Sequence, residues 1–117
     1  MKAFICGSRD FKDMSFFDKT LFDIFKTRGF ASQIISGGAY GADTLAIKYA
    51  ELWEIPCSVI LPDWNRWGKY AGFKRNEEMI ALSPDLVIAF WDGESKGTKN
   101  TIGLAKKAKI KTIIIYV

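Results

Sequence analysis

Three glycine-bearing segments, residues 7–9, 37–43 and 93–98, share one local pattern, since each follows a short apolar run and precedes a stretch with helical spacing. Glycine lets the backbone bring its N–H groups close to a ligand, and the first turn of the following helix offers unpaired donors and a partial positive charge. A phosphate group suits such a turn. Three of them in one small domain, with arginine and lysine side chains nearby, predict one anion-binding crevice.

The predicted ligand-binding residues come from these segments and from the stretch between the second and the third. They are Gly7, Ser8, Arg9, Gly37, Gly38, Ala39, Gly41, Ala42, Asp43, Trp64, Arg75, Asn76, Asp92, Gly93, Ser95, Lys96, Gly97 and Thr98. Arg9 and Arg75 are expected to neutralise the phosphate, because a planar guanidinium can hold it with two hydrogen bonds. Arg75 could instead pair with Glu78 on its own helix, and Asn76 could either cap that helix or contact the ligand.

Carboxylates are the remaining groups for acid–base chemistry. The chain contains no histidine, which excludes Ser-His-Asp and Cys-His nucleophiles and most catalytic zinc sites. The candidate catalytic residues are Asp92, Glu94 and Asp43. Asp92 is expected to lie at the end of a strand beside the crevice. Alternatively, it is an ordinary aspartate of an exposed turn. Asp43 could cap a helix or accept a hydrogen bond from a ribose hydroxyl.

An aromatic, basic loop precedes the third predicted helix. It holds Trp64, Arg66, Trp67, Lys69 and Tyr70. Aromatic rings interleaved with cations suit stacking on a nucleotide base. They suit a contact between subunits equally well, because tryptophan is enriched at protein interfaces.

The composition indicates one globular domain spanning residues 1–117, with 49% apolar residues. The net charge of +4 favours anionic partners without requiring nucleic acid. Cys6 and Cys57 fall in predicted central strands without metal-ligand spacing, so we expect buried, reduced thiols and no metal site. No apolar run approaches the length of a signal peptide or a membrane span, so we expect a cytoplasmic protein without membrane contact.

Strands and helices are expected to alternate. The predicted strands are residues 2–6, 33–36, 57–61, 85–91 and 112–117, and the predicted helices are residues 15–28, 43–53, 72–82 and 98–108. Alternation implies parallel strands, right-handed crossovers and helices on both faces of the sheet. The expected fold is a Rossmann-like three-layer α/β sandwich with a five-stranded parallel sheet in the order 3-2-1-4-5 and four helices. In that order the three glycine segments emerge beside the topological switch point.

Local patterns predict helix ends and faces. Ser15 and Asp18 have the spacing of a capping box for the first helix, and Gly29 is expected to end it. The third helix is expected to bury Phe73, Met79 and Ile80.

Two common nucleotide motifs are absent. Ser36 stands where the dinucleotide fingerprint needs its first glycine, and this stretch follows the second strand rather than the first. The Walker A motif fails because Thr98 stands where its second glycine belongs. An ordinary NAD dehydrogenase, ATPase or kinase is therefore not expected.

A set of motifs in fixed order spans nearly the whole chain. They are Gly7-Ser8-Arg9, Ile35-Ser36-Gly37-Gly38-Ala39-x-Gly41-Ala42-Asp43, Pro62-Asp63-Trp64, Ala71-Gly72-x-x-Arg75-Asn76 and Phe90-Trp91-Asp92-Gly93-x-Ser95-Lys96-Gly97-Thr98. Their order and spacing resemble the YspA-type branch of the SLOG superfamily, a Rossmann-like clan that also holds the LOG cytokinin-activating hydrolases and the DprA DNA-processing proteins. The resemblance implies binding of a nucleotide or nucleotide-derived small molecule, such as an ADP-ribose derivative or a signalling nucleotide, with no further cofactor required.

The same resemblance bears on catalysis. LOG hydrolases cleave the N-glycosidic bond of a nucleoside monophosphate with a loop glutamate. By the resemblance, Arg75 takes the place of their upstream arginine and Gly97-Thr98 matches their Gly-Thr pair, whereas Thr101 holds the place of the glutamate. This implies a protein that binds its ligand without turning it over, as a sensor or a sequestering module.

The sequence is compatible with two other functions. An N-glycosidase would use Asp92, Glu94 or Asp43 in place of the missing glutamate. A DprA-like binder of single-stranded DNA would use the net positive charge and the aromatic loop. We also expect a homodimer or higher homo-oligomer, because the short sheet has two edges and the surface carries several aromatic side chains.

Overall fold

The computed structural model describes all 117 residues, and its strands and helices alternate along the chain. The elements are β1 (Lys2–Gly7), α1 (Met14–Arg28), β2 (Gln33–Ser36), α2 (Ala42–Leu52), β3 (Cys57–Val59), α3 (Trp64–Trp67), the 3-10 helix η1 (Gly68–Tyr70), α4 (Ala71–Ala81), β4 (Leu86–Trp91), α5 (Lys96–Lys107) and β5 (Lys111–Tyr116). No helix combines the length and the apolar character that a membrane crossing requires.

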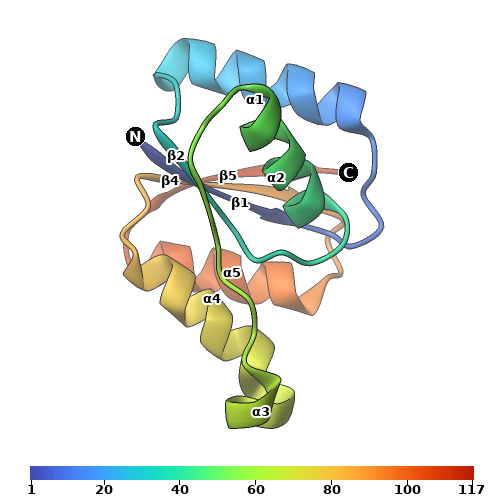
Figure 1. Ribbon diagram of the computed structural model, residues 1–117, viewed down its shortest axis with the longest axis vertical. Coiled ribbons are helices and arrows are strands. Elements are labelled where there is room, and N and C mark those ends of the chain that lie inside the picture. Colours follow the sequence, from blue (N-terminus) through green and yellow to red (C-terminus); the bar gives the residue numbers. More distant parts are fainter.

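The five strands form one parallel sheet in the order β3-β2-β1-β4-β5, which confirms the predicted Rossmann-like fold. Helices α1 and α2 cover one face of this sheet, and α4 and α5 cover the other (Figure 1). The chain order reverses between β1 and β4, so the loops that follow these strands emerge side by side at the switch point.

The two faces of the sheet bury alternate side chains of the same strand. In β1, Ala3 and Ile5 pack on the side of α1 and α2, whereas Phe4 and Cys6 pack on the side of α4 and α5. This follows from the two-residue period of a strand. It brings the end of β1, at Gly7, to the switch point with Cys6 turned toward α5.

Helix α1 begins earlier than predicted. Asp13 is its N-cap residue and accepts a hydrogen bond from the Phe16 N–H at 3.1 Å. The predicted capping box of Ser15 and Asp18 is wrong, because Asp13, two residues before Ser15, is the N-cap residue and Ser15 lies inside the first turn. Gly29 ends the helix as predicted, with a φ of 103° that favours glycine.

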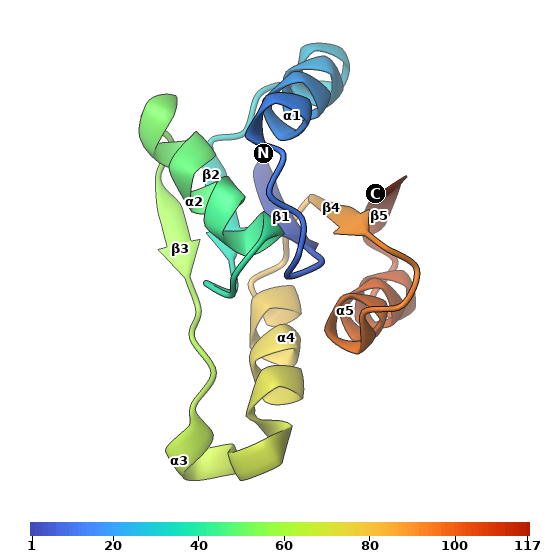
Figure 2. The same cartoon turned by 90° about the vertical axis from the view of Figure 1, so that its right-hand side faces the viewer.

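The segment after β3 differs most from the prediction. Strand β3 ends at Val59, and α3 with η1, residues 64–70, form two short helices that we call the arm. No side chain of the arm is buried, and the arm projects from the body of the molecule (Figure 2). The first turns of α4 also extend beyond the sheet, so Phe73 is 43% exposed and its predicted burial is wrong, whereas Met79 is buried.

The two cysteines differ in position. Cys6 is buried in the central strand β1, whereas Cys57 is half-buried on the edge strand β3, so the expected central position of Cys57 is wrong. Both are free thiols. Burial, and secondarily the charge of Asp43, raise the pKa of the Cys6 thiol, which makes it a poor nucleophile at neutral pH.

Candidate functional site

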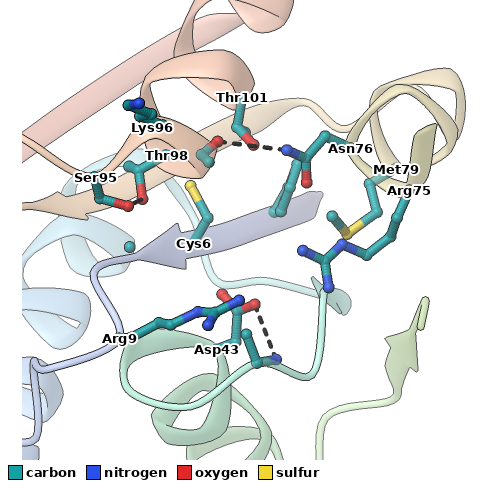
Figure 3. Close-up of a pocket in the computed structure, with 14 residues that line it drawn as sticks. Cys6, Arg9, Asp43, Arg75, Asn76, Met79, Ser95, Lys96, Thr98 and Thr101 are labelled. Atoms are coloured by element: carbon teal, nitrogen blue, oxygen red, sulfur yellow. Dashed lines mark hydrogen bonds between the residues drawn. The ribbon is translucent and has the colours of Figure 1, made fainter. Parts of the chain in front are cut away.

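The carboxyl end of β1 opens onto a hollow of about 370 Å³, which we call the inner hollow (Figure 3). It is lined by Phe4, Cys6, Gly7, Arg9, Ala39, Asp43, Arg75, Asn76, Met79, Ser95, Lys96, Gly97, Thr98 and Thr101. The structure therefore brings parts of all three glycine segments, together with α4, around one space.

The N-terminus of α5 forms one wall of the inner hollow. Ser95 is the N-cap residue, but its side chain accepts no hydrogen bond from a backbone N–H of the helix, so the first N–H groups of α5 lack a side-chain cap. The hydroxyl oxygens of Ser95 and Thr98 lie 3.2 Å apart. A Cβ atom added to Gly97 would meet no protein atom within 4 Å. This wall offers an anion backbone donors, hydroxyl groups, the positive end of a helix and room for close approach.

Asp43 lies on the opposite wall with Arg9 and Arg75 (Figure 3). Its side chain accepts a hydrogen bond from the Ala39 N–H at 3.2 Å, and the residue is 7% exposed. Burial raises the pKa of Asp43 to about 6, against the opposing effects of the Ala39 hydrogen bond and the charges of Arg75 and Arg9. The capping role considered for Asp43 is wrong, because Gly41 is the N-cap residue of α2 and Asp43 lies inside the first turn.

Arg75 reaches from α4 to the loop after β2. Its Nη1 donates a hydrogen bond to the Gly37 carbonyl oxygen at 2.8 Å, and its buried Nε has no hydrogen-bond partner. Burial lowers the pKa of Arg75, Asp43 opposes this shift and Arg9 adds to it. The ion pair considered with Glu78 does not form. The guanidinium therefore keeps hydrogen-bonding capacity that the protein itself does not use.

Asn76 joins α4 to α5. Its Nδ2 donates to the Asn100 Oδ1 at 3.0 Å and to the Gly97 carbonyl oxygen at 3.4 Å, and the residue is buried. Asn76 is thus not a helix cap. It lines the inner hollow and positions the first turn of α5 at the same time.

A second hollow of about 420 Å³ adjoins the first, and we call it the outer hollow. It is lined by Arg9, Gly37, Gly38, Ala39, Tyr40, Thr44, Leu61, Pro62, Trp64, Gly72 and Arg75. Arg9, Ala39 and Arg75 line both hollows, so the two adjoin at these residues, and we describe them as two lobes of one crevice. The rings of Tyr40 and Trp64 are largely exposed beside the outer lobe.

The loop after β4 is held by its own carboxylate. Asp92 Oδ1 accepts hydrogen bonds from the N–H groups of Glu94 and Ser95, each at 2.8 Å, and the Asp92 N–H donates to the Ser8 hydroxyl at 3.0 Å. Hydrogen bonds from Ser95 and Glu94 hold the pKa of the exposed Asp92 carboxyl below its usual value. Asp92, Gly93 and Glu94 line neither hollow.

Three other predicted residues, Ser8, Gly41 and Ala42, line neither hollow, although Gly41 lines a neighbouring hollow together with Arg9 and Tyr40. A Cβ atom at Gly41, where φ is 79°, would collide with the Ser8 carbonyl oxygen, so this glycine allows two loops to pack closely.

The sequence does not predict every residue that lines the hollows. The inner hollow also takes in Phe4, Cys6, Met79 and Thr101, and the outer hollow also takes in Tyr40, Thr44, Leu61, Pro62 and Gly72. Cys6 is the last apolar residue of β1 and points to the same face of the sheet as Phe4, and Met79 lies one helical turn after Arg75. Those two positions follow from periodicity once the crevice has been placed. No group of three or more His, Cys, Asp or Glu side chains gathers where it could hold a metal ion.

Comparison with known proteins agrees with this architecture. Residues 1–67 match the model of the YspA, cpYpsA-related SLOG family, and they include two of the three glycine segments. The Gene 61 protein of Mycobacterium phage D29 is 33% identical over 117 residues, covering 96% of this chain and 94% of that protein. Because the family match covers more than half of its residues, the chain belongs to the YspA, cpYpsA-related SLOG family.

Proposed function

We propose that this chain binds a nucleotide or a nucleotide-derived small molecule, of the kind of an ADP-ribose derivative or a signalling nucleotide, and acts as a sensor or a sequestering module. Membership of the SLOG family supports a nucleotide-related ligand. The observation that carries the proposal is the two-lobed crevice, whose lobes differ in chemistry and share Arg9 and Arg75.

The inner lobe takes the phosphate. The uncapped first turn of α5 supplies N–H donors, the hydroxyl of Thr98 lies beside them, and Gly97 leaves space for close approach. Arg9 and Arg75 balance the charge from the opposite side. Because Asp43 also lies there, a phosphate is accommodated best against α5, with Asp43 facing a neutral part of the ligand such as a ribose hydroxyl.

The outer lobe takes the base. Leu61 and Pro62 give it an apolar side, and Trp64, which is 58% exposed, offers a ring face for stacking. A ligand that reaches from α5 to Trp64 must pass Arg9 and Arg75, where the two lobes meet. A nucleoside carrying one or more phosphates has this distribution of charge and aromatic surface.

Thr101 supports binding rather than turnover. It is buried in the wall of the inner hollow, at the position where the related hydrolases carry their glutamate. A threonine hydroxyl can donate to or accept from a ligand, but it does not act as a carboxylate base.

The proposal is tested by thermal-shift and calorimetric titration against ADP-ribose, NAD, nucleoside monophosphates and cyclic nucleotides, followed by mass spectrometry of each mixture. We expect one ligand to bind and to be recovered intact. Gly97→Ala should weaken binding at least about tenfold, because its methyl group takes up the open space beside the α5 N-terminus. Gly103→Ala is the matched control, since this glycine lies on the same helix, also faces open space and lines neither hollow. Equal affinity in the two variants would contradict the placement of the phosphate.

One observation favours an N-glycosidase as a second candidate. Asp43 is the one carboxylate among the residues lining the two lobes, and its pKa of about 6 suits an acid–base group near neutral pH. This candidate predicts release of a free base from a nucleotide, abolished in Asp43→Asn. Recovery of an intact ligand would exclude it for that ligand.

A further inference from the structure

The chain along the β3 edge of the sheet carries exposed apolar side chains. Val59, Leu61 and Trp64 are all exposed: Val59 ends β3, Leu61 lies in the loop that follows, and Trp64 begins the arm. A groove of about 530 Å³ lies along the same edge, with Ile55 and Val59 among its lining residues. Apolar side chains gathered in this way on a small domain mark an interaction surface.

The backbone of this edge is also unpaired. The Pro56 carbonyl oxygen accepts from the Ile34 N–H, and the Ile60 N–H donates to the Ser36 carbonyl oxygen, so the even-numbered residues of this segment bond to β2. In a parallel ladder the alternate residues point their N–H and C=O groups the other way. Val59 therefore presents free backbone groups outward from the sheet.

Opposite charges lie at the two ends of the edge. Glu51 and Glu54, both exposed, lie in the groove where α2 leads into β3. Arg66 and Lys69, both exposed, lie in the arm, which projects from the other end of β3 (Figure 2). None of the four forms a salt bridge within the chain.

We propose that two copies of this chain associate through their β3 edges across a two-fold axis, with the two strands antiparallel. Val59 then lies near the axis, and the arm of each copy lies beside the junction of α2 and β3 of the other. This arrangement places Arg66 and Lys69 of one copy near Glu51 and Glu54 of the other, whereas a parallel arrangement would bring like charges together.

This association goes beyond the proposed ligand binding but adjoins it. Leu61 and Trp64 contribute both to the exposed edge and to the outer hollow. A second copy packed on this edge restricts the segment that carries them. Because whatever binds the dimer more tightly than the monomer also stabilises the dimer, ligand and self-association would be linked.

The test is sedimentation equilibrium of the whole chain without ligand, at low and moderate salt. We expect a species of twice the 13.2 kDa chain mass. The double variant E51K/E54K should weaken association at least about tenfold, R66E/K69E should do the same, and the four-fold variant that combines them should restore it. Circular dichroism checks that each variant is folded, as expected for substitutions at exposed side chains.

The matched control is D10K/D23K, which adds the same charge at exposed positions outside this edge and should leave the association constant unchanged. A monomeric wild-type chain at high micromolar concentration would overturn the proposal. A dimer that both charge-reversed variants leave intact, or that the combined variant fails to restore, would overturn it equally, since either result places the contact elsewhere. None of these outcomes depends on whether a nucleotide binds.

Discussion

Arg75 donates a hydrogen bond from Nη1 to the carbonyl oxygen of Gly37 at 2.8 Å, across 38 positions of the chain. This bond fastens α4 to the loop after β2. The same guanidinium lies at the junction of the two hollows and beside Asp43. One side chain thus fixes a loop of the crevice and supplies positive charge to whatever binds there.

Replacing Arg75 separates these two roles. Arg75→Lys keeps the charge but loses the planar fork, so we expect ligand affinity to fall about tenfold or more. Arg75→Met removes both and should also lower the free energy of unfolding by about 1–2 kcal/mol through the lost bond to Gly37. Calorimetry and urea denaturation measure the two effects. Lys74→Met, at the half-buried neighbouring position that lines neither hollow, is the control. An equal loss of affinity in this variant would contradict a direct contact between Arg75 and the ligand.

Asp43 should make folding stability depend on pH. Its pKa rises from 3.8 to about 6 on folding, so between these values the folded state binds more protons than the unfolded state. Stability due to this group is therefore highest below pH 4 and is lost as the pH rises through 6, by at most about 3 kcal/mol. Urea denaturation of the wild type and of Asp43→Asn between pH 4 and 8 checks this sign. The free energy of unfolding of the wild type should fall relative to that of Asp43→Asn as the pH rises through 6. A constant difference across the range would contradict the raised pKa.

Trp64 should distinguish nucleotides from simple phosphates. Trp64→Ala removes a ring face from the outer hollow, so affinity for a nucleotide should fall by about 1–3 kcal/mol, while affinity for ribose 5-phosphate stays the same. Because Trp64 is exposed on the single chain, the thermal stability of the monomer should change little. Tyr70→Ala is the control, as an exposed aromatic residue of the arm that lines neither hollow. Equal losses for nucleotide and sugar phosphate would refute a base in the outer hollow.

Asn76 should couple stability to binding. Asn76→Ala leaves Asn100 and the Gly97 carbonyl without their donor, which should lower the free energy of unfolding by about 1–3 kcal/mol. The first turn of α5 then loses its tie to α4, so ligand affinity should fall as well. Asn65→Ala, on the exposed arm, should change neither quantity. Unaltered affinity in Asn76→Ala would mean that α5 holds its place without this bond.

Much of the fold could be predicted because alternating strands and helices leave few topologies, and 3-2-1-4-5 is a common sheet order among them. Helix ends were harder to place. Asp13 and Ser15 are both good capping residues, and only the path of the preceding loop decides between them. The exposure of Phe73 could not be predicted either, because it depends on how far α4 extends past the sheet rather than on the spacing of its apolar residues.

The candidate site, like the fold, could be predicted only in part. Glycines and arginines could be identified as crevice residues from their chemistry and from where their strands end. Sequence could not show that Asp92 turns back to hold its own loop, because an aspartate after a strand can face the crevice or its own backbone. Nor could it show that Gly41 serves the packing of two loops while Gly97 faces open space, since both stand at the start of a helix.

The most direct test of the central claim is a calorimetric titration of the wild-type chain with ADP-ribose, adenosine and inorganic phosphate in parallel, at fixed pH and salt. A ligand that occupies both lobes should bind more tightly than either part alone, and Gly97→Ala and Trp64→Ala should each reduce its affinity toward that of a single part. Failure of ADP-ribose and of every other nucleotide derivative in the panel to bind, or affinity that neither substitution changes, would contradict the assignment of the crevice as a nucleotide site.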